Sequence, residues 1–136
     1  MAILTGITAV RPTTNTQIKR VTYGATVAVG QVVYYDTTDE EYKLADANDT
    51  EETAQAVGIA ITPGVDGGEG YIATGGSIIL VGTTVAVGQV YVVSQTAGGI
   101  DTEGTLTTND YVTTLGLGES SSQLAINIQI SGIQHA

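Results

Sequence analysis

An internal repeat is the feature that most constrains the fold of this chain. The heptapeptide Thr-Val-Ala-Val-Gly-Gln-Val occurs at 26–32 and returns at 84–90, an offset of 58 residues. The same offset places residues 57–60 (VGIA) on residues 115–118 (LGLG), so the similarity extends beyond the heptapeptide. A repeat of this kind predicts two copies of one supersecondary unit that share a core.

The composition favours strands over helices. The 136 residues suffice for one domain, and without Cys, Trp or Phe its core must be filled by fifteen Val, thirteen Ile and seven Leu, with Tyr and Ala in support. The β-branched residues, with twenty-two Thr and eighteen Gly, suit pleated strands joined by turns. The lack of cysteine excludes disulfides and thiolate metal sites.

The alternation of apolar residues indicates the fold class. In the stretch 123–130, Leu124, Ile126, Ile128 and Ile130 alternate with polar or small residues, which predicts a strand. Short strands at intervals of about 8 to 12 residues, with Gly-rich turns, are typical of barrels and sandwiches. We expect an all-β fold: a compact β-barrel or sandwich built from two related β-units, with an extended N-terminal arm and at most one short helix.

The expected domain boundaries follow the repeat. Residues 1–23 are interpreted as the extended arm and residues 24–136 as the β domain, with the internal repeat at 24–81 and 82–136. Pro12 argues against a central strand within the arm.

Several local features are expected inside the units. In each heptapeptide both valines of the Val-Ala-Val segment (Val27 and Val29; Val85 and Val87) should face the core, and the next glycine should supply a bend. Residues 69–74 and 77–81 are expected as two strands separated by a Gly-Gly pair.

One helical turn is plausible in residues 46–56. Asp49 and Glu52 have the spacing of a capping box there. In the strand expected after it, at 57–61, Gly58 marks a place where another backbone can pass closely.

The charge distribution is asymmetric. The net charge of −10 argues against nucleic acid or an anionic membrane as the partner. Arg11, Lys19 and Arg20 are three of the four basic residues, and all fourteen acidic residues lie from Asp36 onward. The arm is either a solvated polar segment or a segment that docks on an acidic surface of another subunit or partner.

Groups for catalysis are poorly placed in the sequence. The only histidine, His135, is one residue from the end and is interpreted as a frayed tail residue, so a nucleophilic triad is not expected. The serines 120–122 lack a nucleophile-elbow pattern. Acid–base work needs a rigidly held pair of carboxyl groups with one of them desolvated, whereas the acidic runs at 39–41 and 49–52 lie in polar loops. We therefore expect a protein that is not an enzyme.

Cofactor, metal and membrane signals are weak. The loop 64–70 is rich in glycine, but it lacks the Lys-Ser/Thr of a phosphate-binding loop. Asp66 and Glu69 are too few for a convincing calcium site. The apolar start has no basic leader or cleavage pattern, and no run approaches about 18 apolar residues. No cofactor, metal or targeting segment is expected.

The repeat also resembles a known family. The motifs VAVGQVVY (27–34), YKLADA (42–47), VGIA (57–60) and GYIATGG (70–76) are similar to small head decoration, or capsid cement, proteins of tailed bacteriophages. The second half continues the resemblance with GQVYVVS (88–94), AGGI (97–100) and YVTTLG (111–116). The resemblance covers roughly residues 22–132.

This resemblance implies a structural virion protein. Such a protein would bind the outer surface of an assembled icosahedral capsid, commonly as a homotrimer, and would link neighbouring copies of the major capsid protein. It would be made in the host cytoplasm and would catalyse no reaction. An N-terminal segment often adds contacts in these proteins. On charge distribution and the apolar start of the chain, the expected contact residues are Ile3, Leu4, Ile7, Arg11, Lys19 and Arg20.

An alternative function belongs to a different class. A receptor- or glycan-binding module of a phage fibre or spike needs aromatic platforms, and the seven tyrosines are the only candidates. Most of them lie in expected strands, where packing is the simpler role; Tyr35 is the residue chosen to test the alternative. A small hydrolase that uses the acidic loops is a third, residual hypothesis.

Overall fold

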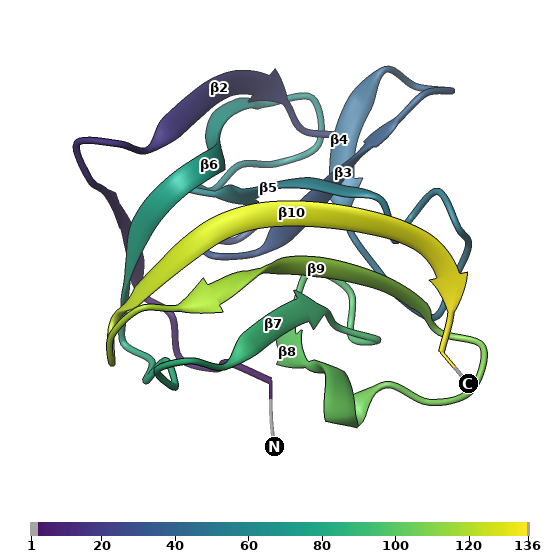
Figure 1. Ribbon diagram of the computed structural model, residues 1–136. Helices are drawn as coiled ribbons and strands as arrows, with labels where there is room; N and C mark the ends of the chain where they lie inside the picture. The colour runs from purple at the N-terminus through teal and green to yellow at the C-terminus, as the bar shows by residue number, and fades with distance from the viewer. Residues whose placement is uncertain (1–2, 136) are drawn as a thin grey trace.

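The computed structural model describes residues 3–135, and nearly all of their regular structure is β-strand (Figure 1). The all-β prediction is therefore confirmed. The only helical element in this part of the chain is one 3₁₀ turn, η1 (Glu103–Thr105). The strands are β1 (Ala9–Pro12), β2 (Gln17–Thr22), β3 (Val32–Asp36), β4 (Glu41–Leu44), β5 (Ala56–Ala60), β6 (Glu69–Val81), β7 (Val90–Val93), β8 (Ile100–Thr102), β9 (Tyr111–Gly118) and β10 (Gln123–Gln134).

The long strand β6 joins two antiparallel sheets. Its first half pairs with β2 and β5, and its second half pairs with β1 and β10. The main path through both sheets is β4-β3-β5-β6-β10-β9-β7-β8, which curls into two lobes (Figure 1). The sequence predicted two strands, 69–74 and 77–81, where the structure has β6 alone. Gly76, with φ of 77°, instead occupies the middle of one continuous strand.

The two units have the same strand pairing. Val32 pairs with Ile59 in the first unit, and Val90 pairs with Leu117 in the second, each 58 positions further on. Both ladders then shift register at the same point, between the second and third pairs. The hairpins β3–β4 and β7–β8 also match: Val33↔Leu44 corresponds to Tyr91↔Thr102, Tyr34↔Lys43 to Val92↔Asp101, and Tyr35↔Tyr42 to Val93↔Ile100.

The repeated heptapeptides form the same turn but are not equally buried. Val27 and Val85 are both buried, as expected, and Val29 is partly buried against the core. The expectation is wrong for Val87, whose side chain is 71% exposed. The N-terminal segment explains the difference, because Ile7 lies against the glycine of the first turn, whereas no atom of residues 3–135 lies within 4 Å of a Cβ built at the glycine of the second.

Two buried clusters lie on opposite sides of β3 and β5. Val33 and Ala60 belong to a small cluster in the first lobe, together with Tyr23, Val27 and other residues. Val32 and Ile59 precede Val33 and Ala60, point to the opposite face, and belong to the large cluster shared with the second unit. Both faces of β3 and β5 therefore contact a buried cluster, so the two lobes pack as one body.

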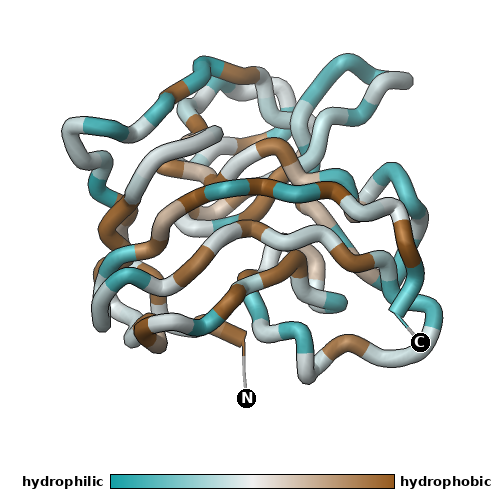
Figure 2. The backbone as a smooth tube through the Cα atoms, viewed as in Figure 1, coloured by the Kyte–Doolittle hydropathy of each residue, from teal (hydrophilic) through white to brown (hydrophobic). Residues whose placement is uncertain are grey.

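Apolar and polar residues alternate along the first part of strand β10 (Figure 2), but the apolar ones are buried only at its beginning. Leu124 and Ile126 are buried and Ile128 is partly buried, but Ile130 is 48% exposed. The register of β10 against β9 shifts twice after Ile126, so the strand twists away from the core before it ends.

Two smaller expectations can be compared with the structure. Residues 46–56 contain turns and no helix; Thr50 and Thr53, rather than Asp49 and Glu52, exchange the reciprocal side-chain to backbone hydrogen bonds. The close approach at Gly58 is present, because a Cβ there would lie 2.7 Å from the carbonyl oxygen of Ala73.

The segment interpreted as an arm is extended, but it lies within the β domain. Strands β1 and β2 cover the second and the first half of β6, respectively. Tyr23, which follows β2, is fully buried and forms a bridge with Tyr42 of β4. Leu4 donates a backbone hydrogen bond of 2.8 Å to Ile100 of β8. The segment thus ties both lobes together; residues 1 and 2 of the expected arm lie outside the described part.

Candidate interaction surfaces

The three apolar residues expected to contact a partner pack largely within the molecule. Leu4 and Ile7 are partly buried and lie against the large core cluster. Ile3 is partly exposed and its side chain lies close to Gly99 in the turn that precedes β8. These side chains hold the N-terminal segment on the second lobe, so little of their surface is left for another protein.

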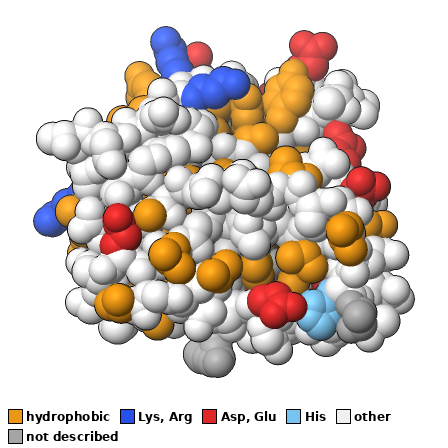
Figure 3. Space-filling view, viewed as in Figure 1, with side chains coloured by type: hydrophobic (Ala, Val, Ile, Leu, Met, Phe, Trp, Pro, Cys, Tyr) orange, Lys and Arg blue, Asp and Glu red, His pale blue; other side chains and the backbone are white. Residues whose placement is uncertain are grey.

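The basic residues Lys19 and Arg20 are neighbours on an exposed part of β2. Four consecutive residues, 17–20, are exposed, although a strand that covers a core normally buries every second side chain. Ile18, which precedes Lys19 and Arg20 in the strand, is 50% exposed. We call residues 17–20 the β2 ridge; Figure 3 shows basic side chains gathered over it at the top of the molecule.

Both basic groups of the β2 ridge have partners that keep them charged. Arg20 forms an ion pair with Glu69, which raises the pKa of the guanidinium. The ammonium of Lys19 lies 5.5 Å from the ring centre of Tyr42, and the hydroxyl of Tyr42 raises the pKa of Lys19. Tyr35 lies beside Tyr42 at a ring distance of 5.0 Å. The ridge is thus a cationic strand edge next to aromatic rings.

Arg11 is not part of this ridge. It lies exposed on β1 opposite Ile79, whereas Arg20 lies opposite Tyr71, eight residues away along β6. The six expected contact residues therefore separate into three groups: an inward apolar set, the β2 ridge and a lone arginine.

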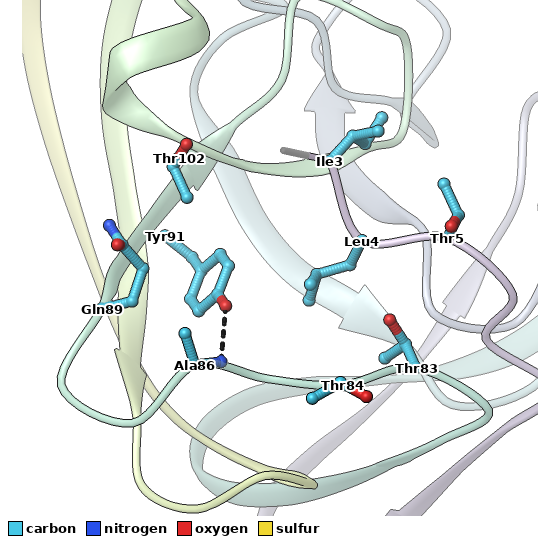
Figure 4. A pocket seen from close by; sticks show the side chains of 9 residues that line it. All are labelled: Ile3, Leu4, Thr5, Thr83, Thr84, Ala86, Gln89, Tyr91 and Thr102. Carbon is cyan, nitrogen blue, oxygen red and sulfur yellow. Dashed lines mark hydrogen bonds between the residues drawn. The ribbon is translucent and has the colours of Figure 1, made fainter. Parts of the chain in front are cut away.

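A hollow of about 410 Å³ lies between the N-terminal segment and the second heptapeptide (Figure 4). Leu4 and Tyr91 face it from opposite sides, and the Tyr91 hydroxyl accepts a hydrogen bond of 2.9 Å from the Ala86 N–H. Its lining contains several threonines and no charged side chain. The hollow therefore offers no group for acid–base chemistry apart from a tyrosine that is already bonded.

The buried carboxylates have structural partners. Asp101 accepts hydrogen bonds from the Ser94 hydroxyl at 3.0 Å and the Thr102 N–H at 2.8 Å. Asp110 accepts one from the Thr107 N–H at 2.8 Å. Sequence reasoning did not single out either residue, and only the Thr-x-x-Asp spacing of Thr107 and Asp110 near a turn could have indicated the second. Within residues 3–135, no group of three or more His, Asp or Glu side chains could hold a metal ion.

His135 is held more firmly than expected of a tail residue. Its backbone exchanges hydrogen bonds with Asn109 and Asp110, at 2.9 and 2.6 Å. Its Nε2 lies 3.1 Å from a carboxylate oxygen of Glu103. These bonds fasten the end of β10 to the loop before β9, so the frayed-tail interpretation is wrong.

Among the described residues, no helix is long and apolar enough to cross a membrane.

A second exposed surface was missed by sequence reasoning. The outer side of β7, β9 and β10 presents Val90 and Leu117, each 44% exposed. The strands β7, β9 and β10 contain no charged residue at all, in a chain with 18 charged residues. We call this surface the neutral face; the residues that line its shallow groove are Val90, Thr114, Gly116, Leu117, Ala125, Asn127 and Gln129.

Comparisons with known proteins add no assignment. No protein-family model matches this chain, and no curated protein shows significant sequence similarity to it.

Proposed function

We propose that this protein binds the outer surface of an icosahedral phage capsid and links neighbouring copies of the major capsid protein. The proposal combines the sequence resemblance with the architecture of the molecule. In this function the protein catalyses no reaction, and its location is the exterior of the virion. It acts by adding interfaces that must break before the capsid can open.

The observation that carries the proposal is the course of β6. A protein that links two capsid subunits must carry load from one contact to another without yielding between them. One continuous strand of 13 residues crosses both lobes of this protein and is hydrogen-bonded to four other strands. A pull applied at one lobe is therefore resisted by many backbone hydrogen bonds in parallel.

The β2 ridge is the surface that we assign to the capsid subunit. Lys19 and Arg20 supply positive charge in a molecule of net charge −10, and Ile18, next to them in the strand, supplies exposed apolar surface. Such a ridge fits an acidic surface with an apolar pocket. Because β2 pairs directly with β6, a load on the ridge passes straight into the central strand.

The test is co-sedimentation with mature capsids of the phage that encodes the chain. The double variant Lys19→Glu/Arg20→Glu should bind at least about tenfold more weakly, because two reversed charges would repel a complementary acidic contact. Arg11→Glu is the matched control, since it changes one exposed basic residue outside the ridge. Unchanged capsid binding by the double variant would reject the ridge assignment.

A second measurement addresses the linking role itself. Capsids that lack the protein should open at a lower temperature and withstand osmotic shock less well than capsids with it bound. An identical opening temperature with and without the protein would count against the proposed function, whatever surface it uses.

The glycan-binding alternative is favoured by one observation. Tyr35 and Tyr71 are 37% and 46% exposed, so two rings are accessible for stacking on a sugar. A glycan array would test it. Binding that is abolished by Tyr35→Ala would replace the capsid proposal, and an array with no signal would remove the alternative.

A further inference from the structure

The repeat makes the exposure of the neutral face informative. The first unit has the same face, made by Val32, Ile59 and Ala73, and all three residues are fully buried. The pairing register places Val90 and Leu117 at the first two of these positions in the second unit.

The position of Ala73 also has an equivalent in the second unit, namely Ala125. Ala73 pairs with Ile59 in the first unit, and Ala125 pairs with Leu117 in the second. In the first unit this face packs into the large cluster, which also contains Leu115, Leu124 and other residues of the second unit. The same three-strand surface is therefore covered by a related unit in one copy and is uncovered in the other.

The chemistry of the neutral face also indicates the kind of partner. A partner of opposite charge would be recognised by charged side chains, and β7, β9 and β10 have none. Two molecules of net charge −10 repel each other, so they can meet most readily where neither presents charge.

The polar groups of the face suit self-association as well. The amides of Asn127 and Gln129 form a hydrogen bond with each other at 3.1 Å. An amide carries both donors and acceptors, so it can pair with a second amide of the same kind without a charged group.

We propose that the neutral face binds a second copy of this chain, with Val90 and Leu117 at the centre of the contact. In this contact the second copy would cover the neutral face of the second unit. The equivalent face of the first unit is already covered by other residues of the same chain. This inference rests on the proposed function, for which the sequence resemblance implies a homotrimer, and it names the surface of self-contact. It is tested on the purified protein alone, so its failure is separate from a failure of capsid binding.

The experiment measures the molar mass by light scattering and by sedimentation velocity over a range of protein concentrations. The wild-type protein should associate into dimers or trimers. Leu117→Lys and Val90→Lys should each weaken the association at least about tenfold, because a lysine in the contact must be desolvated without a partner.

Val65→Lys is the matched control. Val65 is 64% exposed in the loop before β6, so its substitution places the same charge outside the neutral face. Circular dichroism and thermal unfolding establish that each variant is folded. If Leu117→Lys does not fold, Leu117→Ser tests the same contact without adding a charge.

Two results would overturn the inference. One is an association that persists unchanged in both lysine variants. The other is a wild-type protein that stays monomeric at every concentration; if its Leu117→Lys variant also loses capsid binding, the face is assigned to the capsid instead.

Discussion

The hydroxyl of Tyr91 accepts a hydrogen bond of 2.9 Å from the backbone N–H of Ala86 in the second heptapeptide. In the first heptapeptide the equivalent N–H, that of Ala28, donates instead to the side chain of Gln31 at 2.8 Å. Gln89 occupies the place of Gln31, but its side chain donates to the next backbone carbonyl. Two identical segments of seven residues therefore differ in which side chain stabilises the turn.

This difference predicts unequal effects of one substitution at two equivalent positions. Gln31→Ala should lower the free energy of unfolding by about 1 kcal/mol, because it removes the acceptor for the turn N–H. Gln89→Ala should change it by less than about 0.5 kcal/mol, and Tyr91→Phe should cost about 1 kcal/mol. Urea unfolding of the three variants is the measurement. Equal losses at both glutamines would contradict the structure.

The turns of the two hairpins predict opposite effects for two backbone substitutions. Glu40 has φ of 59° and Gly98, 58 positions later, has φ of 79°. A side chain is strained in this left-handed region and glycine is not. Glu40→Gly should therefore raise stability by up to about 1 kcal/mol. Gly98→Ala should lower it by about 1 to 2 kcal/mol, because a Cβ there would also lie 3.0 Å from the Gln31 amide.

The measurement for this pair is thermal unfolding of both variants beside the wild-type protein. A fall in melting temperature for Glu40→Gly would show that the glutamate side chain contributes more than its backbone strain costs.

Removal of residues 1–22 should unfold the protein rather than release a binding arm. The truncation deletes β1 and β2, exposes both outer edges of β6 and removes Val10 and Val21 from the core. We expect loss of a cooperative unfolding transition and a larger hydrodynamic radius. A truncated protein with near wild-type stability would show that this segment is an accessory. Point substitutions on the β2 ridge are therefore the appropriate test of binding.

Two aspartates should respond to pH in opposite directions. Burial raises the pKa of Asp46, so the folded protein binds this proton more tightly than the unfolded chain does. Its contribution to stability therefore improves as the pH falls through the raised pKa. Asp46→Asn keeps an acceptor for the Asn48 N–H, 3.0 Å away. It should gain less than about 1 kcal/mol at neutral pH, since the group is only partly buried, and lose this advantage in acid.

Asp36 is the matched comparison for this experiment. Lys43, 2.9 Å away, lowers the pKa of Asp36, so its stabilising contribution is present at neutral pH and is lost as the pH falls through the lowered pKa. Asp36→Asn should be less stable than the wild-type protein at neutral pH and approach it in acid. Urea unfolding at several pH values gives both curves. Parallel curves for the two variants would contradict these assignments.

Local patterns predicted the strands better than their partners. The heptapeptide repeat indicated two related units, and the alternation around Leu124 and Ile126 indicated a buried strand. The pairing of β1 and β2 with one central strand joins residues about 50 to 70 positions apart. No local propensity encodes that choice, because it depends on which edges of β6 remain open once both units have packed.

The candidate surfaces were harder to predict for a related reason. Ile7 and Val87 are both apolar residues beside a turn, yet one packs on the core and the other is exposed. The sequence pattern within one unit is the same whether or not another unit covers it. Leu117 illustrates this, since its buried equivalent Ile59 lies in a similar apolar context of four residues, with a glycine at the same place.

Both faces of β3 and β5 contact a buried cluster, and this makes the two units depend on each other. A single unit that folded alone would leave Val32 and Ile59 in contact with water. Because both units belong to one chain, each meets the other at an effective concentration that the linkage fixes. The burial of these two residues is therefore independent of the protein concentration.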